Sequence, residues 1–178
     1  MVNPQNALKA ARRLALIMTV GALLLTGLAA LGLVYGVLNT VAAGDALAAL
    51  GGYGAYGVSA AQAWILMGVV AVHVGVWIAL LAVARRLFQE LADARPARAS
   101  RTARRAAMLL WAMLAWGIVS QAIFSVAATW GYPEGERALA IAFGTPQISI
   151  AFSALIASFL AHAFALGAEL WQDHKAVV

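Results

Sequence analysis

The chain has 178 residues, of which 64% are hydrophobic and 11% charged, and its net charge is +5. Soluble domains are about 45–50% apolar and about 25% charged, and a water-soluble fold of this size has too little core to hide so many apolar side chains. The composition therefore excludes an ordinary soluble domain and predicts an integral membrane protein. The absence of cysteine excludes disulfides, thiolate catalysis and cysteine-bound metal centres.

Four stretches are apolar enough to cross a hydrocarbon core of about 30 Å, which takes about 20 helical residues. None contains a charged residue, and each is apolar around its whole circumference. They cover residues 14–38, 61–84, 106–130 and 147–168. We therefore predict an all-α fold, a single integral membrane four-helix bundle over residues 1–178. The first stretch exceeds the about 7–15 residues of a signal-peptide core, so we expect it to be retained.

Lysine and arginine predict the orientation, because these residues are enriched in cytoplasmic segments. Three regions hold every one of the 12 lysines and arginines except Arg137. The regions are the N-terminal segment with Lys9, Arg12 and Arg13, residues 85–105, and the tail with Lys175. In a four-span protein these regions share one side of the membrane. Both termini are therefore predicted to be cytoplasmic.

The outer connection, residues 39–60, is rich in glycine and alanine. Residues 46–50, followed by Gly51 and Gly52, are typical of a short helix with a glycine stop. We expect this loop to lie on the bilayer or fold over the bundle as a connector. A lid over a ligand cavity is the alternative.

The basic inner connection, residues 85–105, carries arginines at three- and four-residue steps. As a helix leading into the third span, with Pro96 in its first turn, it would present a basic face. Such a face would hold the loop in the cytoplasm, or alternatively bind anionic lipid headgroups or an acidic partner. Its members are Arg95, Arg98, Arg101, Arg104 and Arg105. Nucleic-acid binding is not expected, because no aromatic residues alternate with the arginines.

A few polar side chains fall inside the spans, where ionisable residues are functional candidates by default. His73 falls near the midplane, and we expect it to hydrogen-bond across the bundle. The candidate partners are Gln121, Ser125 and Ser153, with Ser120 as a fourth. Because no span contains a carboxylate, we expect neither a metal site nor a proton relay.

His73 and His162 together raise the alternative of a haem b bound by two histidines. Counted from the cytoplasmic ends of their spans, the two side chains differ in depth by about 7–8 Å, which opposes axial ligation of one haem. We therefore expect no cofactor. No residue spacing indicates hydrolysis, phosphoryl transfer or dinucleotide binding, so we also expect no catalytic residues.

Small residues at four-residue steps permit close helix contact in membranes. Gly32 and Gly36 show this spacing in the first span, and Ala71, Gly75 and Ala79 show it in the second. We expect these residues to mark packing within the bundle, with a dimer face as the alternative.

Two segments carry a resemblance to a known family. One is Arg85-Arg86-Leu87-Phe88, and the other runs from Leu160 to Leu170 ahead of a terminal Val177-Val178. With the spacing of the spans, they resemble the bacterial membrane proteins of domain-of-unknown-function family 2975. Residues 92–96 depart from that family's inner loop, and His174 and Lys175 replace its acidic tail positions. The resemblance implies a four-span protein of the bacterial inner membrane and supplies no activity and no functional residues.

Together these features predict a non-enzymatic accessory, regulatory or assembly partner of other membrane components. The expected contacts are the bilayer, anionic headgroups, and either a membrane protein partner or a second copy of the chain. A small transporter or channel with His73 at mid-membrane is the alternative function.

Overall fold

The computed structural model describes residues 4–93 and 95–176, and of residues 4, 5, 7, 96, 168 and 170–176 only the helical backbone. This part of the chain is all-helical. In chain order the helices are α1 (Pro4–Leu38), α2 (Thr40–Leu50), α3 (Ala60–Ala92), α4 (Pro96–Thr129) and α5 (Thr145–Ala176). All except α2 are long and apolar enough to cross a membrane, which confirms the predicted all-α architecture with four candidate spans.

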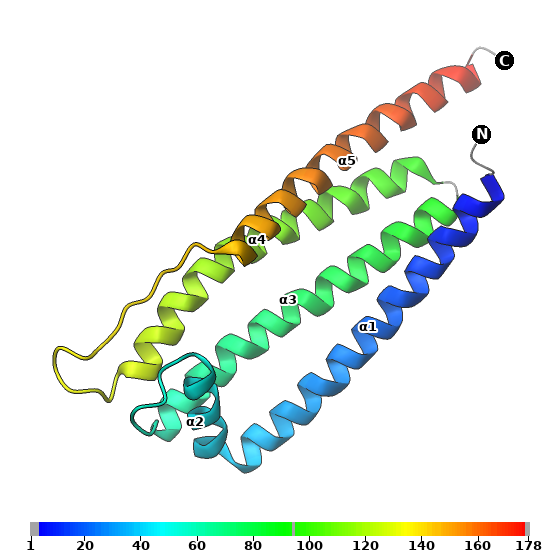
Figure 1. The fold of residues 1–178 in the computed structure, drawn as a ribbon. Helices are drawn as coiled ribbons and strands as arrows, with labels where there is room; N and C mark the ends of the chain where they lie inside the picture. Colours follow the sequence, from blue (N-terminus) through cyan, green and yellow to red (C-terminus); the bar gives the residue numbers. More distant parts are fainter. Residues whose placement is uncertain (1–3, 94, 177–178) are drawn as a thin grey trace.

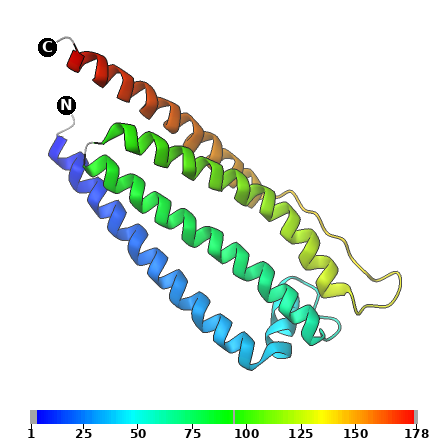
Figure 2. The ribbon, with the colours of Figure 1, turned by 180° about the vertical axis from the view of Figure 1, so that it is seen from behind.

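The four long helices lie side by side in one row (Figures 1 and 2). Helix α1 packs against α3, α3 against α4, and α4 against α5. Helices α1 and α5 therefore lie at the two edges of the row. In a closed bundle α1 would also pack against α4 or α5, and the described residues form no such interface. The predicted bundle is therefore corrected to an open row. A helix that is apolar around its whole circumference has no apolar stripe to mark its packed face, so its sequence does not indicate which helices lie next to it.

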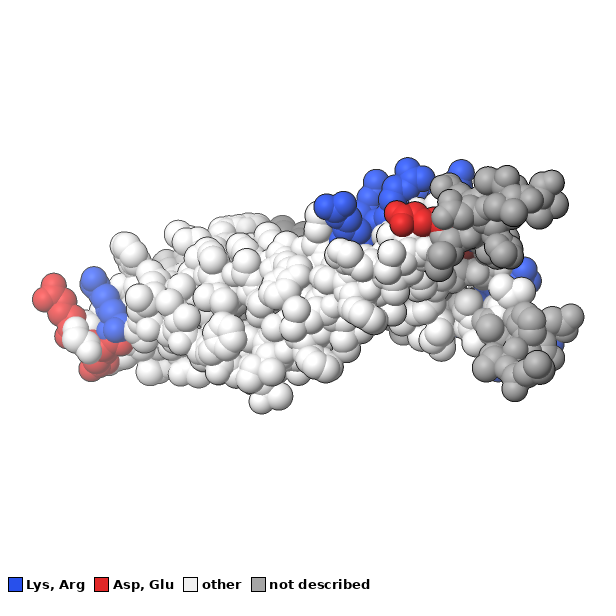
Figure 3. Space-filling model, turned by 90° about the horizontal axis from the view of Figure 1, so that it is seen from above, with Lys and Arg blue, Asp and Glu red and all other residues white. Residues whose placement is uncertain are grey.

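The two ends of the row differ in charge and in structure. One end holds the N-terminal part of α1, the α3–α4 turn and the C-terminal part of α5 (Figure 1). We call it the arginine end, because residues 85–105 lie there. The other end is formed by α2 with residues 51–59 and 131–137, and we call it the cap end. On the face shown in Figure 3, charged residues gather at these two ends, with an uncharged surface between them.

The predicted basic loop is almost entirely helical. Helix α3 continues to Ala92 and α4 begins at Pro96, which leaves a turn of residues 93–95. Pro96 occupies the first turn of α4, as predicted. Alanine and arginine are strong helix formers, so the helices extend beyond the apolar spans that would lie in lipid. The side chain of Lys175 lies outside the described part of the chain.

The connection between α1 and α3 contains a longer helix than predicted. Helix α2 begins at Thr40, directly after α1, and ends at Leu50. The predicted glycine stop is confirmed: the N–H of Gly51 donates to Leu47 O at 3.1 Å, and Gly52 has a φ of 84°. This positive φ explains the glycine, because residues with a Cβ rarely adopt it.

Helix α2 packs on the ends of α3 and α4. The contact is a compact apolar cluster, with Leu66 fully buried at its centre. Its buried members are Ala48, Val58, Ala63, Leu66, Ala127 and Ala128, and Leu47, Tyr53 and Phe124 pack around them. The cluster fills the space beneath α2.

Two polar residues stabilise the cap end. Ser59 and Gln62 form a reciprocal capping box at the start of α3, which satisfies two backbone N–H groups that a helix start leaves free. The Gln62 Nε2 atom also donates to Ala127 O at 2.9 Å and ties α3 to α4.

The small-residue motifs have different roles. A Cβ at Gly36 would overlap Met67 Sδ, so this glycine lets α1 approach α3 closely, as predicted for packing between spans. A Cβ at Gly32 or Gly75 would meet no atom within 4 Å. These two glycines therefore do not mediate packing between the described helices.

Candidate functional site

Helix α4 distributes its arginines over two faces at the arginine end. Side chains three and four residues apart lie on one side of a helix. Arg98, Arg101 and Arg105 follow these steps and line an open pocket of about 240 Å³ towards α3. Arg104 lines a second pocket, of about 350 Å³, between α4 and α5. The predicted basic face is therefore divided between two neighbouring pockets.

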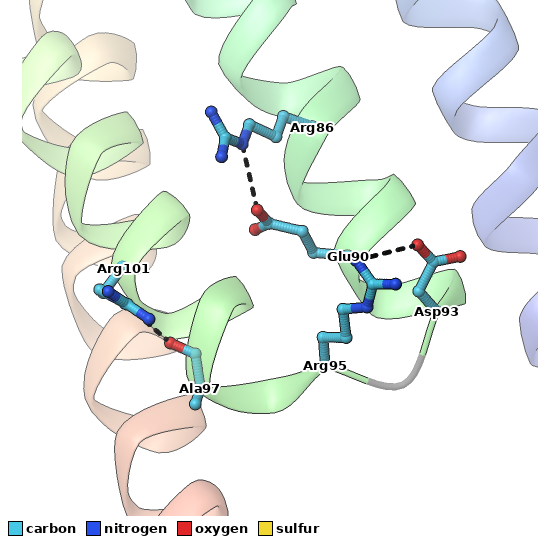
Figure 4. A network of polar contacts seen from close by, with 6 residues as sticks. All are labelled: Arg86, Glu90, Asp93, Arg95, Ala97 and Arg101. Carbon is cyan, nitrogen blue, oxygen red and sulfur yellow. Dashed lines mark hydrogen bonds and ion pairs between the residues drawn. The ribbon is translucent and has the colours of Figure 1, made fainter.

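The α3–α4 pocket contains one buried carboxylate among four guanidinium groups. Its other lining residues are Arg86, Glu90 and Thr102. Arg86 Nε donates to Glu90 Oε1 at 3.1 Å (Figure 4). Glu90 is only 8% exposed, and its Oε2 atom is buried and has no hydrogen-bond partner in the described part of the chain. An unpaired buried acceptor is costly, so this oxygen marks a place where a donor would be stabilising.

The fifth predicted arginine belongs to the turn. Arg95 Nη1 lies 3.9 Å from Asp93 Oδ2, and both side chains are more than half exposed (Figure 4). Exposed pairs of this kind contribute roughly 0–1 kcal/mol. Arg95 thus forms its ion pair within the turn between α3 and α4, and it is not among the residues that line the α3–α4 pocket.

The α4–α5 pocket combines Arg104 with His162 and an apolar wall. His162 Nδ1 lies 3.0 Å from Ser158 O. A carbonyl oxygen can only accept, so Nδ1 is the donor in this contact. Met108 and Trp111 are the largest apolar residues that line it. The pocket therefore combines one guanidinium group with an apolar wall.

His73 does not join the predicted intramembrane cluster. Its Nε2 atom accepts a hydrogen bond of 3.3 Å from Trp77 Nε1, one turn further along α3. The described residues form no hydrogen bond from His73 to Gln121, Ser125 or Ser153, so this prediction is wrong. Residues four apart on one helix are neighbours, so Trp77 lies within reach of the imidazole.

The two candidate haem ligands lie on different sides of α4. His73 belongs to α3 and His162 to α5, and α4 packs between these helices (Figures 1 and 2). Two axial ligands must face each other across one porphyrin. The row does not bring the two imidazoles into such a position.

Gln121 and Ser125 instead hold an extended segment of the chain, together with Thr129. These residues lie four apart on α4 and accept hydrogen bonds from alternate backbone N–H groups of residues 138–142. The bonds run from Ala138 N to Thr129 Oγ1 at 3.0 Å, from Ala140 N to Ser125 Oγ at 2.9 Å, and from Ala142 N to Gln121 Oε1 at 2.8 Å. Four helical residues rise about 6 Å and two extended residues about 6.6 Å, so the two repeats match. We call this arrangement the polar ladder.

The remaining candidate hydroxyls bond within their own helices. Ser153 Oγ donates to Ser149 O at 2.8 Å, and Ser120 Oγ donates to Gly117 O at 3.2 Å. Such bonds satisfy a hydroxyl in an apolar environment without linking helices. Neither serine therefore belongs to a site shared between helices.

Sequence reasoning missed two of these features, although the sequence carries a signal for each. Arg86 and Glu90 stand four apart, the spacing of an ion pair on one helix face. Residues 138–143 read Ala-Leu-Ala-Ile-Ala-Phe. This alternation of small and large residues is typical of an extended segment.

At the cap end, aromatic and polar contacts join the loop of residues 51–59 to the loop of residues 131–137. The rings of Tyr56 and Tyr132 meet edge to face at a centroid distance of 4.6 Å. Tyr56 Oη donates to Glu136 Oε2 at 3.0 Å. This hydrogen bond and the negative charge of Glu136 raise the pKa of Tyr56 above its ordinary value of 10.0. The neutral phenol is therefore the form that joins the loops.

The raised pKa of Tyr56 predicts a change in alkaline titration. Because the pKa is raised in the folded protein, the contact with Glu136 is present at neutral pH and is lost as the pH rises through that raised value. We expect Glu136→Gln to lower the pKa of Tyr56, since it removes the negative charge. Absorbance at 295 nm of the protein and of the Tyr56→Phe variant isolates this titration. An identical Tyr56 titration in Glu136→Gln would contradict the assigned contact.

No protein-family model, curated protein or solved structure matches the chain.

Proposed function

We propose that the chain is a multi-pass protein of the bacterial inner membrane, with both termini in the cytoplasm. It acts without enzymatic chemistry, as an accessory or assembly partner of other membrane components. The four helices that are long and apolar enough to cross a membrane support this location. The resemblance to family 2975 supports four spans in a bacterial membrane and adds no activity.

The distribution of basic residues supports the orientation. The turn between α3 and α4 and the N-terminal part of α1 lie at one end of the row (Figure 1). This end holds Arg12, Arg13 and the arginines of residues 85–105. Arg137 belongs to the cap end, where its Nε donates to Tyr132 O. An excess of lysine and arginine on one side is the usual mark of the cytoplasmic side.

The partner role rests on one observation, the extended segment of residues 138–144. Gln121 lies two helical turns below Thr129 along α4, so the polar ladder carries this backbone about 12 Å down the row. Leu139, Ile141 and Phe143 are 60–69% exposed. In an extended chain, successive N–H groups point to opposite edges, so the amides of these three residues face away from α4.

Lipid cannot form hydrogen bonds with the backbone N–H groups that face away from α4. Non-helical backbone at membrane depth is tolerated where protein or a water-filled cavity covers it, because each unsatisfied backbone group costs several kcal/mol in hydrocarbon. The exposed apolar side chains of the segment argue against water. A second polypeptide that covers residues 138–144 meets the requirement, which is the reason for proposing an assembly partner.

Single cysteines test the orientation directly, since the chain has no cysteine of its own. We expect Ala55→Cys, at the cap end, to react with a membrane-impermeant maleimide in intact cells. Ala97→Cys, at the arginine end, is expected to react only after the cells are opened. Both positions are exposed, so burial does not protect either thiol. The reverse pattern would contradict the proposed orientation.

A photo-crosslinking residue at position 141 tests the partner role. We expect a discrete adduct with a membrane polypeptide, either a second copy or another protein. The matched control is position 17, because Ile17 is also an exposed isoleucine, at 59%, but lies on the helical surface of α1. That position should form no discrete polypeptide adduct. Equal patterns at the two positions, or no adduct at position 141, would refute the partner role.

A further inference from the structure

We propose that the α3–α4 pocket binds the headgroup of an anionic glycerophospholipid that carries a free hydroxyl, with the phosphate on the arginines and the hydroxyl on Glu90. The inference rests on the proposed membrane placement but not on the proposed partner role. It concerns the pocket lined by Arg86, Glu90, Arg98, Arg101, Thr102 and Arg105.

The charges of the pocket select an anion. Four guanidinium groups and one carboxylate leave three positive charges around a space of about 240 Å³. Guanidinium groups bind phosphate oxygens through paired hydrogen bonds, and a helix holds their spacing. Arg86 already donates to Glu90. The phosphate would therefore be bound by the three arginines of α4, which are Arg98, Arg101 and Arg105.

The position of the pocket favours a lipid over a soluble phosphate. Arg86 follows the uncharged stretch of α3 directly after Arg85, and Arg105 immediately precedes the uncharged stretch of α4. The pocket therefore lies where the apolar surface ends, which is the level of the phosphates in a leaflet. Basic pockets between transmembrane helices on the cytoplasmic side bind lipid headgroups.

Glu90 adds the requirement for a hydroxyl. Its Oε1 atom is bonded to Arg86, but its Oε2 atom is buried and has no partner among the described residues. A second anion at this oxygen would be repelled, whereas a hydroxyl donor would satisfy it. The pocket thus distinguishes a phosphodiester with a free hydroxyl from a bare phosphate. Phosphatidylglycerol has this chemistry, whereas phosphatidate is a phosphomonoester and lacks the alcohol hydroxyl of the headgroup.

Titration of the purified full chain in a neutral detergent, followed by its tryptophan fluorescence, tests the site. The probes are dihexanoyl phosphatidylglycerol, dihexanoyl phosphatidate and the chain-free glycerophosphoglycerol. We expect phosphatidylglycerol to bind at least about tenfold more tightly than phosphatidate, because a hydrogen bond to a charged group contributes about 1.5–3 kcal/mol. Equal affinity for the two lipids would refute the role of Glu90. Equal binding of glycerophosphoglycerol and the lipid would show that the ligand is soluble.

Two adjacent arginines supply the matched control. Arg105→Gln and Arg104→Gln remove the same charge from neighbouring positions, but Arg105 lines the α3–α4 pocket and Arg104 the α4–α5 pocket. We expect Arg105→Gln to weaken phosphatidylglycerol binding about fivefold, the contribution of one basic residue near a lipid surface. Arg104→Gln should leave the affinity unchanged. Equal losses in both variants would refute the pocket and indicate general attraction to a charged surface.

Glu90→Gln separates recognition from mere support of the fold. The amide removes the repulsion of a bare phosphate and the charge of the acceptor. We therefore expect tighter phosphatidate binding and a preference for phosphatidylglycerol close to onefold. Weaker binding of both lipids would mean that Glu90 only positions Arg86, and would overturn its assignment to the hydroxyl.

Discussion

Replacing Gly44 by leucine is expected to release α2 from the row. A Cβ at position 44 would overlap the Cβ of Ala63 and lie only 2.7 Å from Val58 Cγ2 and 2.9 Å from Ala63 Cα. The last of these atoms is backbone of α3, so a side-chain rotation cannot relieve the contact. Overpacking usually costs about 1–3 kcal/mol, which exceeds the gain of about 0.8 kcal/mol in helix propensity that leucine brings.

The measurement is the rate of chymotrypsin cleavage at Tyr53 and Tyr56 in the purified protein. If α2 lifts off, its cluster with Leu66 opens, and we expect cleavage to accelerate at least about tenfold, since about 1.4 kcal/mol of lost docking energy corresponds to that factor. Gly68→Leu is the control, because a Cβ at Gly68, on the neighbouring α3, meets no atom of the described residues within 4 Å. Equal cleavage of the Gly44→Leu variant and the unaltered chain would contradict close packing at Gly44.

The sequence predicted the spans but not their arrangement. The four uncharged stretches are a strong signal, because any charge within them would be costly in lipid. The same uniformity hides which helices touch, since no apolar stripe distinguishes a packed face from a face in lipid. Only local features reveal contacts, such as Gly36, which admits Met67 Sδ. The equally spaced Gly32 faces open space, so the motif alone did not identify the contact.

The candidate site was predicted in part. Helical spacing correctly grouped Arg98, Arg101 and Arg105, but it did not separate Arg104 from them, because the row places a different helix on each side of α4. Glu90 was missed since its burial comes from packing between α3 and α4, which the sequence does not encode locally. Gln121 was recognised as polar at depth. Its hydrogen-bond partner was not predicted, because that partner is a backbone N–H group, that of Ala142, which no side-chain pattern reveals.

Removing the polar ladder should detach residues 138–144 from α4. In the triple variant Gln121→Leu, Ser125→Ala and Thr129→Val, three N–H groups lose their acceptors. Ser125 and Thr129 are each 1% exposed, so water does not readily replace them. Hydrogen bonds in membrane proteins contribute about 0.6 kcal/mol on average and about 1.7 kcal/mol at most, which gives a total of about 2–5 kcal/mol.

The reactivity of a single cysteine at position 140 reports this detachment. Ala140 carries the middle hydrogen bond of the ladder and is half-buried, so the substituted thiol should react slowly while the segment is docked. A loss of about 2 kcal/mol shifts the docking equilibrium roughly thirtyfold, so we expect maleimide labelling to accelerate by at least about tenfold in the triple variant. Ser153→Ala in the same background is the control, because its hydroxyl bonds only to Ser149 O of its own helix. If the triple variant labels at the parental rate, apolar contacts and not the ladder hold the segment. In that case the surface that residues 138–144 present to a partner would not depend on the ladder, and the apolar side chains of Leu139, Ile141 and Phe143 would define it.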